Sequence, residues 1–494
     1  MIRPPLASLA VVVALAVGAV LAGSNGPAPQ RSGAVGDVPI VGATAVCPDL
    51  RQGAQASRAS VGVDSQPDSA AMKGTLDAAR VTGTGPPLAV PPIEPGQVAV
   101  DLGGDVQGDG IAFTATGRLA AGLQAEQVSR ADKGPARGLA GLRCDAPRTD
   151  AWFEGGGSTV MDSTVLVLAD VDSTPSQVDV TAFTGTGPVD ARPGRGITVP
   201  PHGRVVLNMD TLAPDRSLLA VHVASRRGRF AAGLLHSQRA ALVSLGQDWV
   251  PQAQPPAVRV VVPGLPQGPG VRAVRVTNPG SDDTVVRLQV TTADGQFVPN
   301  GLDSVAVPAG TTVERRLDTL TAASALTVTV TSDGAPVLAG AVVVDADAGS
   351  PAREFCYTTG ALPLSGPALL TDLGVGPATS STLILTAPQE EATVVVTPLT
   401  VLGARGPLPA AKTVFVPAGR TRTVPLSSLL PAGATARLAL EVRPAAGSGP
   451  VYAARYLRER AAGGPLTTLL VLRGPAQQVA RPVVVRDPAV GAGG

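Results

Sequence analysis

The sequence has few of the residues that carry most protein chemistry. Aromatic residues make up 2% of its 494 positions, and it contains three histidines and three cysteines. Binding platforms for carbohydrate or single-stranded nucleic acid need exposed rings, so this composition argues against both. The formal net charge is +1, which creates no long-range field toward nucleic acid or an acidic partner. We therefore expect no nucleic-acid partner.

Helix signals are also nearly absent, because proline and glycine interrupt every window long enough for an amphipathic helix. The chain nevertheless is 44% hydrophobic, mostly alanine, valine and leucine. That fraction is enough to form buried cores, so we do not expect a globally disordered chain. Its length suits about three to five domains.

A proline–glycine turn recurs four times along the chain. Its glycines are Gly96, Gly203, Gly310 and Gly419, spaced by 107 to 109 residues. Proline sets one backbone dihedral and glycine accepts a positive φ, so the pair marks a tight turn. A short apolar segment follows each copy. A turn with a fixed period predicts four copies of one domain.

The third copy shows the internal pattern most clearly. Apolar and polar residues alternate over 286–291 and 326–331, as in half-buried strands, and Asn278-Pro279-Gly280 marks a turn. Each copy holds about six or seven such strands in about 105 residues. We predict an all-β fold, a tandem array of about four immunoglobulin-like antiparallel β-sandwich domains after an N-terminal signal or anchor segment.

The repeat and the composition divide the chain into seven segments. These are a signal peptide or membrane anchor at 1–23, a flexible stalk at 24–46, β-sandwich repeats at 47–143, 144–249, 250–355 and 356–486, and a loose tail at 487–494. Residues 24–46 are small and polar without any period, which is typical of a flexible linker.

The N-terminal segment carries a targeting pattern. Arg3 precedes the uncharged apolar run 6–22, and small residues follow it. The run is long for a signal peptide and short for a membrane span, so both a cleaved signal and an uncleaved anchor stay open. We expect an extracytoplasmic protein, either secreted or anchored in the cytoplasmic membrane facing outward. The membrane would be contacted only through residues 6–22, if they are uncleaved.

Cys47 and Cys144 bracket the first repeat, 97 residues apart. Either they form a disulfide that closes this repeat or they are unrelated thiols, since spacing does not determine connectivity. We predict the disulfide, which leaves Cys356 free.

No pattern in the sequence indicates a catalytic, cofactor-binding or metal-binding site, and we predict no cofactor. The three histidines lack metal-ligand spacing, and we interpret them as unrelated surface or edge residues. The run 155–158 lacks the glycine that a nucleophile elbow needs two residues after its serine, and we interpret it as a flexible connection. The basic clusters 226–229 and 455–460 are interpreted as solvated hairpin tips. The histidines are His202, His222 and His236.

The two tryptophans lie near repeat boundaries. Trp152, with its neighbour Phe153, opens the second repeat, and Trp249 closes it. A tryptophan ring buries a large area while its N–H keeps one partner. These residues therefore form either a contact surface for a partner or joints between neighbouring repeats.

The block Trp152–Val160, with the segments 196–203, 219–223 and 262–266, resembles a known family. It is similar to uncharacterised secreted proteins of actinobacteria that are catalogued as a domain of unknown function. The resemblance covers most of residues 47–480. It implies an exported, envelope-associated protein and carries over no activity and no functional residue.

Two functions stay open. The first is an exported, cell-envelope-associated, non-enzymatic scaffold or binding protein, whose partner is an unknown envelope protein or polymer. The alternative is an envelope-polymer hydrolase with a site formed by dispersed loop carboxylates. Acid–base catalysis needs two carboxylates in different environments facing one cleft, and exposed neighbours such as Glu390 and Glu391 do not indicate this. We expect that the protein is not an enzyme.

Overall fold

The computed structural model describes residues 30–32, 37–49, 54–65, 73–85, 88–103, 108–241, 243–321, 324–346, 353–373, 378–404, 407–429, 438–475, 478–480 and 484–486. The regular secondary structure of these residues is nearly all β-strand, and most of the strand pairs are antiparallel. The helical elements are single turns: η1 (Gly117–Leu119), η2 (Arg192–Gly194), α2 (Met209–Leu212), α3 (Asp318–Thr321) and η3 (Leu426–Leu429). No helix in this part of the chain is long and apolar enough to cross a membrane.

The chain divides into two compact units, residues 1–39 with 478–494, and residues 40–477. In the first unit, β1 (Gln30–Ser32) pairs with β38 (Val484–Arg486), and β2 (Asp37–Pro39) pairs with β37 (Gln478–Ala480). The predicted fourth repeat was extended to residue 486, but its last strands pair with this N-terminal segment instead. Sequence alternation identifies a strand without identifying its partner. The predicted signal or anchor at 1–23 and tail at 487–494 lie outside the described residues.

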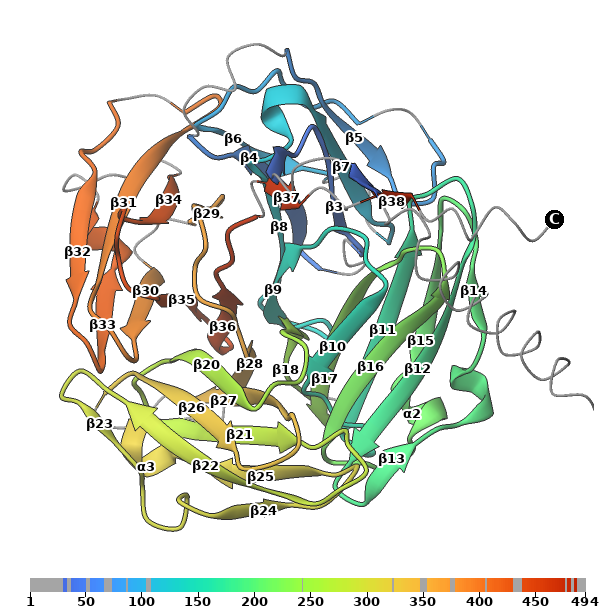
Figure 1. The fold of residues 1–494 in the computed structure, drawn as a ribbon, viewed down its shortest axis with the longest axis vertical. Helices are drawn as coiled ribbons and strands as arrows, with labels where there is room; N and C mark the ends of the chain where they lie inside the picture. The colour runs from blue at the N-terminus through green and yellow to red at the C-terminus, as the bar shows by residue number, and fades with distance from the viewer. Residues whose placement is uncertain are drawn as a thin grey trace, which may run out of the picture. The chain divides into compact units, whose positions relative to one another are not determined.

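The second unit contains four pairs of sheets in chain order (Figure 1). In the first pair, β3 (Gly42–Cys47), β7 (Ile111–Thr116) and β5 (Leu76–Arg80) share a core with β6 (Gln97–Leu102), β4 (Ala56–Val63), β8 (Leu123–Ala131) and β9 (Gly138–Cys144). The predicted stalk, residues 24–46, therefore extends too far along the chain, because its last residues belong to β3. The segment 42–47 pairs with β7 because Ala45 and Cys47 are buried in this core.

The second pair of sheets joins a six-stranded and a four-stranded sheet around one core. The first sheet holds β13 (Gly187–Val189), β12 (Ser176–Thr184), β16 (Leu219–Arg227), β10 (Asp150–Glu154) and β19 (Gln252–Ala253), with β14 (Ile197–Val199) beside β12. The second sheet holds β15 (Gly203–Asn208), β11 (Asp162–Asp170), β17 (Ala231–Ala240) and β18 (Val243–Val250).

The third pair follows the same plan. Its first sheet holds β20 (Arg259–Leu265), β26 (Leu326–Ser332), β22 (Thr284–Thr291) and β23 (Gln296–Phe297), with β24 (Val305–Val307) beside β22. Its second sheet holds β25 (Thr312–Arg316), β21 (Gly270–Thr277), β27 (Leu338–Ala346) and β28 (Arg353–Thr359).

The fourth pair closes the series. Its first sheet holds β29 (Ala368–Leu370), β34 (Ala439–Pro444), β31 (Ala392–Val401) and β32 (Lys412–Val416). Its second sheet holds β33 (Arg420–Pro425), β30 (Thr379–Ala387), β35 (Tyr452–Ala461) and β36 (Gly464–Val471). A parallel pairing of β31 with β6 connects the fourth pair to the first.

Four strands, which we call the central strands, bring the sheet pairs together. They are β9, β18, β28 and β36, and each lies at one edge of its sheet. The central strands contact one another in a closed cycle, β9–β18–β28–β36–β9. The predicted division between residues 355 and 356 falls inside β28, where Cys356 is fully buried. Burial of this strand among the others leaves no loop at that position.

The repeated turn precedes β6, β15, β25 and β33. The last three lie at the opposite edge of their sheets from the central strands, and β6 is separated from β9 by β4 and β8 and pairs with β31 on its other side. Gly96, Gly310 and Gly419 adopt positive φ angles of 81°, 67° and 67°. In the second copy His202, with φ of 46°, takes this conformation in place of glycine. The turn therefore marks the same place in all four sheet pairs.

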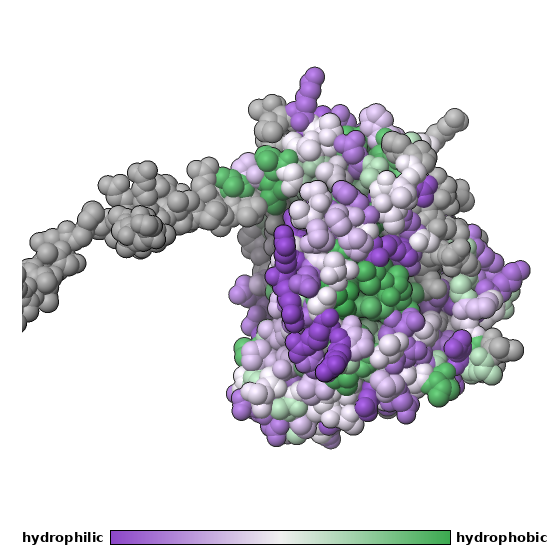
Figure 2. Space-filling view, turned by 90° about the vertical axis from the view of Figure 1, so that its right-hand side faces the viewer, coloured by the Kyte–Doolittle hydropathy of each residue, from purple (hydrophilic) through white to green (hydrophobic). Residues whose placement is uncertain are grey.

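One face of the protein has a mixed polar surface. Figure 2 shows hydrophilic residues over most of the side near β14 and β15, with apolar residues gathered in a limited area. Exposed apolar side chains in the described residues include Val160 and Val206, at 88% and 51%. Scattered exposure of this kind is ordinary for a folded protein and indicates no binding surface.

His202 gives a direct test of the repeated turn. A residue with a Cβ at this φ is strained by roughly 1 kcal/mol, part of which glycine's greater freedom in the unfolded chain offsets. We expect His202→Gly to raise the free energy of unfolding by up to about 1 kcal/mol in urea denaturation. Gly310→Ala should lower it by about 1–3 kcal/mol, because the new Cβ would lie 2.6 Å from Pro188 Cδ. A less stable His202→Gly variant would contradict the assignment.

Candidate functional site

Asp248 lies where the central strands meet. It belongs to β18 and is fully buried. Its Oδ1 accepts hydrogen bonds from the Gly141 N–H of β9 at 3.1 Å and from the Thr468 hydroxyl of β36 at 2.9 Å. Burial raises the pKa of Asp248 well above its usual range, while Thr468 and backbone N–H groups, among them that of Tyr357 in β28, act in the opposite direction. One carboxylate thus connects strands from all four sheet pairs.

A second buried carboxylate lies among the same strands. Glu354 of β28 accepts a hydrogen bond from the Gln247 N–H at 2.9 Å and lies 3.5 Å from Arg137 Nη1. Arg137 also donates to the carbonyls of Arg353 and Pro465, at 3.0 and 2.8 Å. Burial raises the pKa of Glu354 well above its usual range, and the charge of Arg137 opposes this. These contacts fix the central strands against one another.

Both tryptophans lie within strands, whereas the sequence indicated only that they lie near repeat boundaries. Trp249 is fully buried in β18 and packs with Ala140 and Leu142 of β9. Trp152 of β10 is 9% exposed, packs against Leu338 of the third sheet pair, and stacks on His222 with 3.7 Å between ring centroids. Their burial leaves little ring surface for a partner, so both rings act in joints between sheet pairs.

Phe153 lies at 0% exposure in the core of the second sheet pair. Its neighbour on β10, Trp152, faces the other side of the sheet, as alternation along a strand requires. Phe153 is therefore a core residue and offers no contact surface.

His236 was interpreted as a surface or edge residue, but it is 2% exposed. Its Nε2 lies 3.0 Å from Asp162 Oδ1 and its Nδ1 lies 2.7 Å from the Tyr357 hydroxyl. With Asp162 ionised, this pattern assigns the proton to Nε2 and makes Nδ1 the acceptor. Burial lowers the pKa of His236, and Asp162 opposes that change. The chain of three groups connects the second sheet pair to the third.

The acidic end of this chain stays ionised. Burial alone would raise the pKa of Asp162, but hydrogen bonds from His236, Thr159 and Gln238 lower it to about 2. At the other end, burial raises the pKa of Tyr357 to about 12. Tyr357 is fully buried, so a substrate has no access to its hydroxyl. The hydrogen-bonded chain instead stabilises the contact between the two sheet pairs.

The run 155–158, interpreted above as a flexible connection, is buried and fixed. Gly156 accepts a hydrogen bond from Arg275 Nη1 at 2.9 Å, and its N–H donates to the Tyr357 hydroxyl at 3.3 Å. Glycine is needed at this position because φ is 100° and a Cβ would lie 2.8 Å from Thr164 Oγ1. The segment is part of the same joint.

Glu154 lies beside this joint and is fully buried. The Thr277 hydroxyl donates to its Oε2 at 2.6 Å, and its Oε1 has no hydrogen-bond partner among the described residues. Burial raises the pKa of Glu154 to about 8, although Thr277 and Arg275 lower it in part. The carboxyl is therefore largely protonated at neutral pH.

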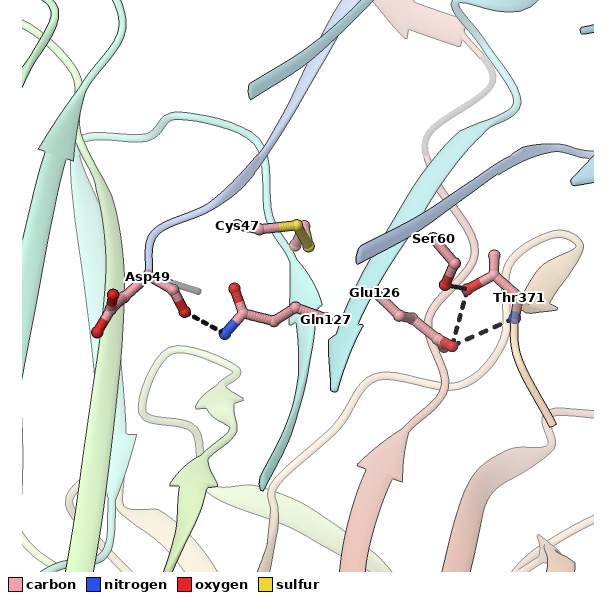
Figure 3. The surroundings of a disulfide bond; sticks show 7 residues. Cys47, Asp49, Ser60, Glu126, Gln127 and Thr371 are labelled. Carbon is pink, nitrogen blue, oxygen red and sulfur yellow. Dashed lines mark hydrogen bonds between the residues drawn. A yellow bond between two sulfur atoms is a disulfide. The ribbon is translucent and has the colours of Figure 1, made fainter. Parts of the chain in front are cut away.

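Cys47 and Cys144 are joined by a disulfide that connects β3 to β9, with 4.6 Å between Cα atoms (Figure 3). Close by, Gln127 Nε2 donates to the Asp49 carbonyl at 2.8 Å. The disulfide closes a loop of 97 residues in sequence separation. Cys356 is a buried free thiol whose pKa burial raises well above its usual range.

A cavity of about 460 Å³ lies beside this disulfide, and we call it the arginine cavity. It is lined by parts of β3, β8 and β9 and by the segments that follow all four central strands. Those segments are 145–148, 253–255, 361–365 and 473–475. Because the central strands pack together, the segments that leave them converge at this cavity.

The charged residues lining the arginine cavity are Arg143, Asp145, Arg148 and Arg473. Arg143 is neutralised internally, since its Nη1 donates to Glu126 at 2.8 Å and its Nη2 donates to Gln124 Oε1 at 2.7 Å. Asp145 is then the one carboxylate of the described cavity lining that can pair with the other two arginines, Arg148 and Arg473. Its Oδ1 lies 3.4 Å from Arg148 Nη2 and 3.9 Å from Arg473 Nη1. The cavity therefore carries a surplus of positive charge.

Arg473 is the least satisfied of these groups. Its guanidinium makes no hydrogen bond within the described part of the chain, and its Asp145 contact is longer than a hydrogen bond. Burial lowers the pKa of Arg473, and the charges of Arg148 and Arg143 lower it further. About one third of the side chain is accessible, at 30% exposure, because it borders the cavity.

Sequence reasoning did not identify the cavity residues. Arg143 lies in β9, Asp145 and Arg148 follow that strand, and Arg473 follows β36. Only the packing of the central strands brings these residues together. The predicted solvated cluster 455–460 is wrong at Arg455, which is 1% exposed and lies 4.0 Å from Glu126. Arg226 and Arg229 are half-exposed partners of Asp179 and Asp172. The described residues contain no group of three metal-ligating side chains.

This architecture, antiparallel sheets around a shared polar centre, can now be compared with known proteins. The chain matches a family of unknown function, DUF5719, over residues 104–427, and so it belongs to that family. The match includes Arg143, Asp145 and Arg148. No curated protein matches the chain. The crystal structure of Thermotoga maritima 1070 is 17% identical, covers 22% of this chain and 96% of its own, and has a TM-score of 0.19, which supports no inference.

Glu154 predicts a pH-dependent stability. A carboxyl whose folded pKa is about 8 and whose ordinary value is 4.5 contributes stability below pH 4.5 that is lost as the pH rises toward 8. Glu154→Gln removes that loss, so we expect equal stability at pH 4 and a gain of roughly 3–5 kcal/mol above pH 8. Thermal melting of the wild type and Glu154→Gln across this pH range measures the difference in stability, and the exposed Glu390→Gln serves as the control. A constant difference at all pH values would contradict the assignment.

The disulfide predicts a large effect of reduction. Opening a closed loop of this length restores freedom to the unfolded chain, so Cys47→Ala/Cys144→Ala should lose about 4 kcal/mol of stability. Wild-type melting should respond to dithiothreitol, whereas the double variant should not. Thiol titration in denaturant should find one free thiol before reduction and three after it. Three thiols before reduction would refute the disulfide.

Proposed function

We propose that this protein is an exported, cell-envelope-associated, non-enzymatic binding scaffold, built of tandem immunoglobulin-like β-sandwich repeats and binding an anionic partner at the arginine cavity. The observation that carries the proposal is the convergence of segments from all four central strands on one cavity with surplus positive charge. A cavity of this size lies in the range of small-ligand sites.

The arrangement of sheets supports a scaffold. Each sheet pair has its own apolar core and two antiparallel sheets, which is the plan of a β-sandwich repeat. The contacts of Asp248 and Glu354 fix the repeats against one another, so loops at the cavity have a rigid support. A preformed site loses little conformational entropy when its partner binds.

Export is supported by the disulfide between Cys47 and Cys144, because disulfides persist mainly in oxidising, extracytoplasmic compartments. The apolar run 6–22 and the resemblance to secreted proteins point the same way. An envelope protein or polymer with anionic groups would suit the charge of the cavity.

The hydrolase alternative receives less support. Hydrolysis by paired carboxylates needs two such groups at one accessible cleft. Asp145 is the one carboxylate among the described residues that line the arginine cavity. The carboxylates of Asp248, Glu354 and Glu154 are enclosed between sheets and hold structural hydrogen bonds.

Cosedimentation with washed envelope fragments of the producing bacterium tests the proposal on the purified full-length chain. The double variant Arg148→Gln/Arg473→Gln should bind at least about tenfold more weakly, because it removes two charge-assisted contacts. Arg226→Gln/Arg229→Gln removes the same charge from exposed partners of Asp179 and Asp172 and should bind like the wild type. Unchanged binding in the first variant, or equal loss in both, would overturn the proposal.

A further inference from the structure

We propose that the ligand of the arginine cavity is a single-chain amphiphilic anion, with a carboxylate or phosphate head at Arg148 and Arg473 and an aliphatic chain against the cavity wall. This inference rests on the proposed function in one respect, the assignment of this cavity as the binding site. It goes further by naming both chemical parts of the ligand.

Arg148 and Arg473 would bind the anionic head group of the ligand. Arg148 Nη2 and Arg473 Nη1 lie 3.4 and 3.9 Å from the same oxygen, Asp145 Oδ1. Both distances are longer than those of charge-assisted hydrogen bonds. The amide of Gln252, oriented by its contact with Asp145 Oδ2, accepts from Arg148 Nη1 at 2.6 Å and holds that side chain in place. Arg473 keeps its donors for a partner. An anion between the two guanidinium groups would satisfy donors that the protein leaves unused.

The charge arrangement also favours a bound anion. A cation next to apolar walls is costly unless it is paired and hydrogen-bonded. Asp145 can neutralise one of the two arginines, and its backbone is fixed because its carbonyl accepts the Val46 N–H at 2.9 Å. The second positive charge therefore has no protein counterpart in the cavity, and a bound carboxylate or phosphate would supply it.

The other residues that line the arginine cavity would contact the aliphatic chain of the ligand. Small aliphatic side chains and prolines dominate it, and the described lining residues include no aromatic ring. Sugars and nucleobases are usually held by stacking on rings, so this wall does not suit them. An aliphatic chain needs only apolar contact surface, which alanine and leucine provide. Representative lining residues are Ala43, Ala121, Leu123, Ala146, Ala253 and Pro363.

Isothermal titration of the full-length protein with defined probes below their micelle concentrations tests the inference. The probes are acetate, inorganic phosphate, octanoate, decanoate, decyl phosphate and decyltrimethylammonium. Decanoate and decyl phosphate should bind, and affinity should rise by up to about fourfold for each added CH₂ between octanoate and decanoate. The stronger of decanoate and decyl phosphate distinguishes a fatty-acid source from a lipid-phosphate source.

Matched variants locate the binding. Arg473→Gln and Arg148→Gln should each weaken decanoate binding at least about tenfold. Arg229→Gln, an exposed partner of Asp172, should have no effect. Ala146→Trp fills the cavity from an exposed position that should tolerate a larger side chain, so it should block binding while the melting temperature stays near that of the wild type.

The outcomes separate the two proposals. If acetate or inorganic phosphate binds as tightly as decanoate, the aliphatic part is overturned while an anion-binding scaffold stands. If decyltrimethylammonium binds as tightly, the anionic head is overturned. If no probe binds, or if the arginine variants bind normally, the inference is overturned, and envelope cosedimentation then decides the proposed function independently.

Discussion

The burial of four sheet edges against one another is the constraint on which this protein depends. An edge strand has unpaired backbone N–H and C=O groups, which favour aggregation when exposed and cost free energy when buried without partners. The central strands β9, β18, β28 and β36 are all edges, and they pack on one another. Polar side chains make this possible, since Asp248 accepts the Gly141 N–H, Glu354 accepts the Gln247 N–H, and Arg137 donates to two carbonyls.

This packing also explains where the cavity lies. The chain leaves β9, β18 and β28 for the next sheet pair, and these connecting segments lie at the cavity together with the segment that follows β36. Residues far apart in sequence, such as Arg143 and Arg473, become neighbours, and the Arg143 guanidinium even approaches the Arg473 carbonyl at 3.5 Å. The disulfide at Cys144 and the Arg143–Glu126 ion pair then hold the cavity wall. The cavity is thus a consequence of how the sheet pairs meet.

The β-strands and the recurring turn could be predicted from sequence because their signals are local. Gly310 and its counterparts mark one turn, and alternation over 286–291 marks a strand with one buried face. The junction could not be predicted, because its contacts join residues separated by more than 100 positions, such as Gly141 with Asp248. Glu354 and Arg455 have the composition of solvated charges, and only their neighbours in space show that they are buried. Tryptophans near boundaries likewise indicated joints without indicating that they lie inside strands.

The contrast between the junction and the cavity is informative about function. At the junction, Asp248 and Glu354 accept hydrogen bonds from neighbouring strands, and burial raises the pKa of both carboxyl groups well above the usual range. At the cavity, Arg473 has neither a hydrogen bond within the described chain nor a carboxylate closer than 3.9 Å. Its side chain is 30% accessible at the cavity, so its unused donors can be reached by solvent or by a partner. Unused donors of this kind would suit an anion.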